Sequence, residues 1–157
     1  MDIKKAARED SKILTDLAIR SKSHWGYNEK QIAAWEEELT ITEKYINEEQ
    51  VYKLTVGNAL IGFYAYKIEK QTHVKLDFLF VEPEFMGQGY GKILILNLLE
   101  RVEHSEYETI LVDSDPNAEG FYAKLDFLKI GELESSIKNR FLPIMELKIK
   151  HRSKVKF

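Results

Sequence analysis

The chain contains no cysteine among its 157 residues. This absence excludes disulfide bonds and a thiol nucleophile, and it favours a reducing compartment such as the cytoplasm. No apolar run approaches the roughly 20 residues that a membrane-spanning helix needs. Residues 1–5 also lack the apolar core of a signal peptide. We therefore expect a cytoplasmic protein with no membrane partner.

The chain also lacks a strong charge of one sign. Its 23 Lys and Arg residues are balanced by 26 Asp and Glu residues, for a net charge of −3. This balance gives no electrostatic reason to expect a nucleic-acid partner. The basic residues of the last ten positions predict a solvated final strand and a basic C-terminal tail at residues 151–157. The remaining residues, 1–150, have the length of a single globular domain.

Apolar periodicity predicts an alternation of strands and helices with no linker, repeat or low-complexity segment. Asn28 is expected to cap the second helix, and Asp10 or Ser11 the first. Gly57-Asn58 should form a hairpin turn. The expected strands are residues 2–6, 51–56, 60–68, 74–81, 109–113, 127–133 and 144–149, and the expected helices are residues 11–22, 28–39, 88–104 and 116–125.

The most informative segment is residues 80–92, FVEPEFMGQGYGK. A β-favouring run breaks at Pro83, passes through Gly87, Gly89 and Gly91, and enters a helix-favouring run. The first N–H groups of a helix have no intrahelical partner and carry the positive end of the helix dipole. Glycines let a ligand approach the backbone closely. The segment therefore predicts an anion-binding turn.

Two common glycine motifs do not fit this segment. A P-loop would need glycine at Met86 and Ser or Thr at Ile93. A dinucleotide-binding fingerprint would need glycine at Lys92, or at Leu94 if it is counted from Gly89.

The glycine spacing, just after Val-Glu-Pro-Glu, instead resembles the pyrophosphate loop of the GCN5-related N-acetyltransferase (GNAT) family. A second stretch, SDPNAEGFYAKLDF at residues 114–127, resembles the later helix of that family, which usually ends in F-Y-x-x-x-G-F. The two motifs occur in the family's order, and the resemblance covers nearly the whole chain. The alternative is an ordinary glycine turn followed by an unrelated helix.

The resemblance implies an α/β (α+β) fold with a mixed, mostly antiparallel sheet of about seven strands flanked by about four helices. It implies direct transfer of the acetyl group of acetyl-CoA to a primary amine of a small molecule or peptide, without a metal. It leaves a homodimer open. Two other functions compete with this one: a non-catalytic acyl-CoA-binding sensor or scaffold, and an unrelated α/β nucleotide binder, which the failed fingerprints disfavour.

The resemblance also implies how the cofactor is held. N–H groups of the glycine loop would bind the pyrophosphate, and the backbone at the end of the fourth strand would pair with the pantetheine arm. The Lys92 ammonium would either contact a phosphate or face solvent. The implied cofactor-binding residues are Leu79, Phe80, Val81, Gly87, Gln88, Gly89, Tyr90, Gly91, Lys92, Asp115, Asn117 and Tyr122.

Two residues are candidates for proton transfer. The resemblance gives Tyr122 the role of general acid towards the departing sulfur, and a tyrosine is protonated at neutral pH. The alternative is a core tyrosine beside Phe121. Asp77 is the candidate base, and its alternative is a surface charge opposite a lysine such as Lys75. If the protein has no base, water would accept the proton of the acceptor ammonium. Glu82, beside the glycine loop, is expected to be a structural residue.

The chain departs from the family pattern at three positions. Met86 replaces an Arg or Gln, which removes one phosphate contact. Asp115 replaces an asparagine that meets the cofactor, with Asn117 as a substitute, and it suits a helix cap before Pro116. Asp126 replaces a glycine and is expected in the left-handed region of backbone conformation.

The amine acceptor is expected near the connection between the first two helices, where the family shapes this side of its site. Residues 21–28 combine aromatic rings with hydrogen-bonding groups, as pockets for small polar ligands do. His24, Trp25 and Tyr27 are the candidate contacts. The alternatives are a loop whose Trp25 and Tyr27 fill the core, and a His24 that lies at the surface.

Overall fold

A computed structural model describes residues 1–137 and 139–150, and the predicted basic tail at 151–157 lies outside them. The described chain groups into two compact units. The N-terminal unit comprises residues 1–66 and 78–95, and the C-terminal unit comprises residues 67–77 and the chain from residue 96 onward. The single domain expected over residues 1–150 stays a prediction.

The N-terminal unit contains three antiparallel strands: β1 (Asp2–Lys5), β2 (Gln50–Val56) and most of β3 (Ala59–Glu69). The turn between β2 and β3 is the predicted Gly57-Asn58 turn, and Gly57 has a φ of 60°. The β3 residues 61–66 are all buried, because β3 is an inner strand of the sheet.

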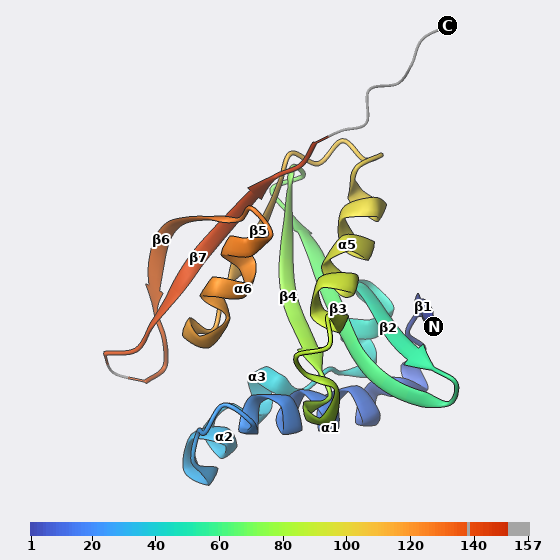
Figure 1. The fold of residues 1–157 in the computed structure, drawn as a ribbon, viewed down its shortest axis with the longest axis vertical. Coiled ribbons are helices and arrows are strands. Elements are labelled where there is room, and N and C mark those ends of the chain that lie inside the picture. Colours follow the sequence, from blue (N-terminus) through green and yellow to red (C-terminus); the bar gives the residue numbers. More distant parts are fainter. Residues whose placement is uncertain (138, 151–157) are drawn as a thin grey trace, which may run out of the picture. The chain divides into compact units, whose positions relative to one another are not determined.

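Four helices also belong to this unit: α1 (Ser11–Ser23), α2 (Glu29–Ala34), α3 (Glu36–Leu39) and α4 (Glu43–Glu48), with a 3-10 turn, η1 (Arg8–Asp10), before α1. The buried stripe of α1 has helical spacing and consists of Leu14, Leu17, Ala18 and Ser21. The helices α2 and α3 lie against α1 (Figure 1).

Two features of these helices differ from the prediction. The helix expected over residues 28–39 is interrupted at Trp35, whose N–H is shared between the Gln31 and Ile32 carbonyls. The Trp35 ring packs against Tyr27, a tertiary contact that periodicity does not encode. The helix α4 was not predicted, because Ile46 is its only buried residue and one apolar residue shows no period.

The C-terminal unit contains the beginning of β4 (His73–Val81) together with β5 (Thr109–Asp113), β6 (Leu128–Glu134) and β7 (Phe141–Lys148). The strands β4 and β5 are parallel, whereas β7 is antiparallel to both β5 and β6. A 3-10 turn, η3 (Pro116–Ala118), leads into α6 (Glu119–Lys124), which lies against β6 and β7 (Figure 1). The helix α5 (Tyr90–Val102) runs from one unit into the other.

The strand order is β1-β2-β3-β4-β5-β7-β6, in a sheet of seven strands that is mostly antiparallel. The predicted fold class is therefore confirmed, although the described residues form six α-helices rather than about four. None of the helices in the described part of the chain is long and apolar enough to cross a membrane.

Candidate functional site

The glycine loop connects β4 to α5 within the N-terminal unit. After β4 a 3-10 turn, η2 (Pro83–Phe85), leads into the loop, and α5 begins at Tyr90 rather than at Gln88. Gly87 and Gly89 have φ values of 77° and 88°, which glycine adopts most readily. A Cβ atom on either residue would have no described atom within 4 Å. The space beside this backbone is therefore open.

The first turn of α5 presents free N–H groups at the end of the loop. The Ile93 N–H donates to the Gly89 carbonyl at 3.1 Å and closes the turn. The N–H groups of residues 90–92 precede this bond and have no intrahelical acceptor. The dipole of a 13-residue helix adds positive potential there. The Lys92 side chain is exposed, which suits both of its expected roles.

The end of β4 carries Leu79, Phe80 and Val81, the backbone expected to pair with pantetheine. The register pairs β5 with His73 to Leu76 of β4, so these three residues lie beyond the paired stretch. On the side of β3, the Glu82 N–H donates to the Ile61 carbonyl at 2.8 Å.

Gly62 in β3 makes this close approach to β4 possible, and sequence reasoning did not single it out. A Cβ atom at Gly62 would lie 2.6 Å from the Phe80 carbonyl oxygen. We expect Gly62→Ala to displace the end of β4, to cost about 1–3 kcal/mol of unfolding free energy and to weaken coenzyme A binding. Thermal melting and calorimetric titration measure both effects. The control is Gly131→Ala, whose Cβ would lie at 3.7 Å from the Ile144 side chain; equal stability and affinity of the two variants would contradict the prediction.

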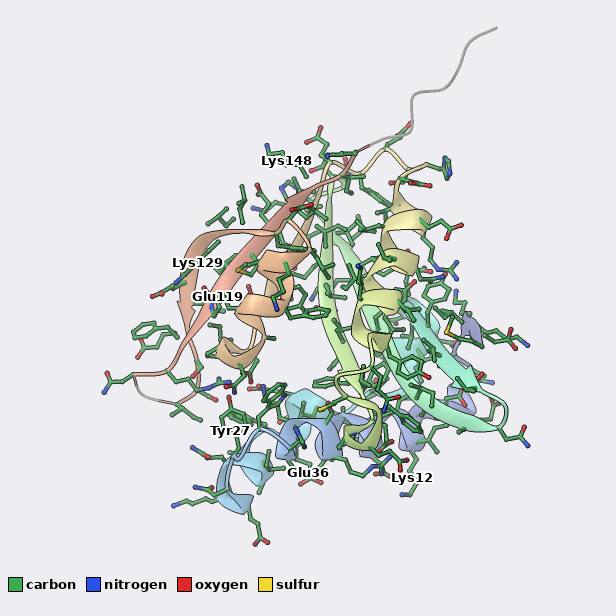
Figure 2. All side chains as sticks on the ribbon, in the orientation of Figure 1. Lys12, Tyr27, Glu36, Glu119, Lys129 and Lys148 are labelled. Atoms are coloured by element: carbon green, nitrogen blue, oxygen red, sulfur yellow. The ribbon has the colours of Figure 1, made fainter. Side chains whose placement is uncertain are left out.

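The segment between α1 and α2 carries the three expected acceptor contacts, of which Tyr27 is labelled in Figure 2. His24 and Trp25 are exposed and their rings meet edge to face, with centroids 5.7 Å apart. Trp25 is 46% exposed, so the alternative in which it fills the core is wrong. Tyr27 is half-buried and packs edge to face on the buried Trp35, with centroids 4.7 Å apart. The segment ends at Asn28, which caps α2 as predicted and shares reciprocal hydrogen bonds with Gln31.

Tyr122 lies on α6 in the C-terminal unit and is buried. Its ring meets the Phe121 and Phe127 rings edge to face, with centroids 5.1 and 5.3 Å away. Burial, and to a smaller extent the Asp115 carboxylate, raises the pKa of Tyr122 well above its usual value. The hydroxyl therefore stays protonated at neutral pH and can donate a proton or a hydrogen bond. The core contacts and the acid role are compatible with each other.

Asp115, which lies before α6, forms an ion pair with Arg140, which lies before β7. Sequence reasoning missed this pair. One Asp115 oxygen accepts the Asn117 N–H at 2.8 Å, and the other accepts from Arg140 Nη2 at 2.9 Å. The pair is mostly buried, with side-chain exposures of 13% and 15%. Asp115 thus caps its turn before Pro116, as predicted. Asp126 has a φ of 70°, which confirms its expected left-handed backbone.

The two acidic candidates on β4 differ in their surroundings. Alternation along the strand places half-buried Asp77 on the same side as Leu79 and Val81. The Lys75 ammonium, considered above as its partner, lies 2.7 Å from the Asp113 carboxylate. Glu82 accepts two hydrogen bonds from Arg20, which agrees with the structural character expected of it.

A sequence model described as an acetyltransferase (GNAT) domain matches residues 18–149. The match includes both motifs and all of the candidate residues.

Curated relatives include proteins named "Uncharacterized N-acetyltransferase ycf52". The protein from Pyropia yezoensis is 28% identical over 79 residues, which is 50% of this chain and 45% of that protein. The protein from Porphyra purpurea is 29% identical over 79 residues, with the same coverage of 50% and 45%. The chain thus spans about half the length of these relatives.

Solved structures share the fold at low sequence identity. The PaiA N-acetyltransferase of Thermoplasma acidophilum, in complex with coenzyme A, is 23% identical with a TM-score of 0.75; the match covers 94% of this chain and 98% of that one. An aminoglycoside 6'-N-acetyltransferase complexed with coenzyme A is 19% identical with a TM-score of 0.71; the match covers 97% and 99%.

Proposed function

Because this chain belongs to the acetyltransferase (GNAT) domain family, we propose that it transfers the acetyl group of acetyl-CoA directly to a primary amine of a small molecule or peptide. The observation that carries the proposal is the glycine loop. Its backbone borders open space at Gly87 and Gly89 and leads into the N-terminus of α5. Proteins of similar fold are in complex with coenzyme A.

In this proposal the N–H groups of residues 87–92 bind the two phosphates of the cofactor as charge-assisted hydrogen-bond donors. Gln88, Tyr90 and Lys92 border the same site. The backbone of Leu79, Phe80 and Val81 pairs with the pantetheine amides as an added strand would. Both Asp115 oxygens already accept hydrogen bonds from the protein. In the family, an asparagine at the position of Asp115 contacts the cofactor. Here we assign that contact to the side-chain amide of Asn117.

The cofactor supplies an acetyl group activated as a thioester. The acceptor nitrogen forms a bond to the acetyl carbonyl carbon, and the carbon–sulfur bond breaks. Tyr122 donates its proton, or a hydrogen bond, to the leaving sulfur; its raised pKa keeps the hydroxyl neutral and favours the hydrogen bond over full proton transfer. As the amide forms, the nitrogen releases a proton that neutralises the coenzyme A thiolate or restores the Tyr122 hydroxyl. The ammonium form of the acceptor loses its proton before attack, to Asp77 or to water.

Two measurements test the proposal. Calorimetric titration with acetyl-CoA asks whether the cofactor binds, and release of free coenzyme A thiol across a panel of amines asks whether the acetyl group moves. The chain has no cysteine, so a thiol reagent reports only the product. Binding without thiol release from any amine would favour a sensor or scaffold module, and absence of acetyl-CoA binding would overturn the proposal.

We also propose that His24, Trp25 and Tyr27 contact the acceptor rather than the cofactor. Loss of one hydrogen-bonding group should raise the acceptor KM or lower kcat by about 2–10-fold, with the acetyl-CoA affinity nearly unchanged. The test is steady-state kinetics of His24→Ala and Tyr27→Phe. The control is His104→Ala, which changes an exposed histidine in the turn that follows α5. Normal kinetics in both test variants would move the acceptor site elsewhere.

A further inference from the structure

The last turn of α1 contacts the beginning of the glycine loop through Arg20. Arg20 Nε lies 2.6 Å from Glu82 Oε1, and Arg20 Nη2 lies 2.8 Å from Glu82 Oε2. Two parallel hydrogen bonds of this kind fix the relative orientation of a guanidinium and a carboxylate. Glu82 directly follows β4, and its carbonyl accepts the Phe85 N–H at 2.9 Å. Arg20 therefore fixes Glu82, the residue that connects β4 to the segment containing the glycine loop.

The same turn contacts the acceptor side through Lys22. The Lys22 ammonium lies 5.4 Å from the centroid of the Tyr27 ring and 5.1 Å from that of the Trp35 ring. A cation at this distance from an aromatic face is attracted to it. Because Trp35 is only 4% exposed, its ring is a fixed support. Lys22 thereby ties α1 to Tyr27 and Trp35, two residues of the range 24–35, which we name the acceptor segment.

The helix α1, which carries both of these residues, is held by buried side chains and by hydrogen bonds. Leu14, Leu17 and Ala18 are completely buried. Near its beginning, α1 is also fixed to Ile41: the Ser11 hydroxyl donates to the Ile41 carbonyl at 2.6 Å, and the Ile41 N–H donates to Thr15 Oγ1 at 2.9 Å. Arg20 and Lys22 both lie in the last turn of α1, so this one turn carries the contact to Glu82 and the contacts to the two aromatic rings.

We propose that the last turn of α1 couples cofactor binding at the glycine loop to the order of the acceptor segment, with Arg20 and Lys22 as positioning residues. This inference rests on the proposed function, because it takes the coenzyme A diphosphate to bind the loop. A ligand that fixes the loop also fixes Glu82 and Arg20, and α1 then restrains the acceptor segment through Lys22. Coupling of this kind is reciprocal, so an ordered acceptor segment favours cofactor binding equally.

Arg20 also has an electrostatic role in this proposal. The Glu82 side chain is only 15% exposed, and without a cation beside it its charge would oppose a diphosphate at the loop. Arg20→Lys keeps the positive charge but loses the two-point geometry. This variant therefore separates charge from position: coenzyme A should still bind, whereas the coupling to the acceptor segment should weaken.

The experiment is hydrogen–deuterium exchange of the full chain with and without coenzyme A. In the parent protein we expect slower exchange in peptides from the glycine loop and in peptides from the acceptor segment. In Arg20→Lys and in Lys22→Met the loop should still be protected, and the added protection of the acceptor segment should fall at least about threefold. The matched control is Lys12→Met, on the exposed face at the other end of α1 (Figure 2), which should behave as the parent does.

The outcomes separate the two proposals. No protection of the glycine loop in the parent would overturn the proposed cofactor site, and the coupling with it. Protection of the loop without any change in the acceptor segment would overturn the coupling alone. The coupling would also be overturned if both variants kept the full added protection of the acceptor segment, because that protection would then arise from direct contact with the ligand. Circular dichroism checks each fold, and either variant suffices if the other does not fold.

Discussion

Replacing Tyr122 with phenylalanine should lower turnover by about 100-fold, the lower end of the range for one positioned proton donor. The ring keeps its contacts with Phe121 and Phe127, so the fold and the acetyl-CoA affinity should change little. Only the hydroxyl disappears, and with it the proton offered to the leaving sulfur. Steady-state kinetics with a true acceptor, together with calorimetric titration of acetyl-CoA, measure the two parts of this expectation.

The matched control is Tyr52→Phe, which removes a hydroxyl from a half-buried tyrosine on β2 and should leave turnover unchanged. If Tyr122→Phe turned over as fast as this control, Tyr122 would be a packing residue and leaving-group protonation would need another donor.

The raised pKa of Tyr122 predicts a further difference at alkaline pH. Burial, followed by the Asp115 charge, places the folded pKa above the unfolded value of about 10. Below about pH 10 the Tyr122 hydroxyl is neutral in both the folded and the unfolded chain. Above that pH the hydroxyl ionises first in the unfolded chain, so the free energy of unfolding falls as the pH rises. Tyr122→Phe lacks this loss. Its melting temperature should fall less than that of the parent between about pH 9 and 11.

Replacing Gly89 with valine should abolish most acetyl-CoA binding. The φ of 88° at this position is one that a β-branched residue rarely adopts, and the new side chain would occupy the open space beside the loop. Loss of two charge-assisted hydrogen bonds to the phosphates, at about 1.5–3 kcal/mol each, corresponds to roughly a 10²–10⁴-fold loss of affinity. Calorimetric titration measures this loss.

Gly57→Val provides a control with comparable backbone strain. Gly57 also has positive φ, of 60°, and a Cβ there would have no described atom within 4 Å, but it lies in the β2–β3 turn. This variant should lose some stability and bind acetyl-CoA normally. Unchanged affinity in a folded Gly89→Val protein would contradict the assignment of the pyrophosphate to this loop.

The Asp115–Arg140 pair accounts for one departure from the family pattern. A carboxylate in place of an asparagine brings a negative charge to a mostly buried position, and burial of a charge is tolerated when it is paired and hydrogen-bonded. Arg140 and the Asn117 N–H supply these partners. The same carboxylate keeps the cap before Pro116 that the sequence predicts.

The sequence by itself determined the features that depend on neighbouring residues. Four features follow from local rules about periodicity, capping and backbone freedom: the order of the seven strands, the glycine loop between β4 and α5, the Asn28 cap and the left-handed Asp126. Each rule acts over a few positions, so a single chain carries the whole signal. The two motifs are also local, and they were sufficient to predict the fold.

Only the tertiary structure decided the contacts between distant positions. The interruption at Trp35, the close approach at Gly62, and the pairs Arg20–Glu82 and Asp115–Arg140 join residues up to 62 positions apart. A charged residue in an isolated sequence gives no sign of its partner, since any exposed Arg or Glu obeys the same local rules. Packing selects the partner, because a buried charge or ring must find a compatible neighbour when the chain folds.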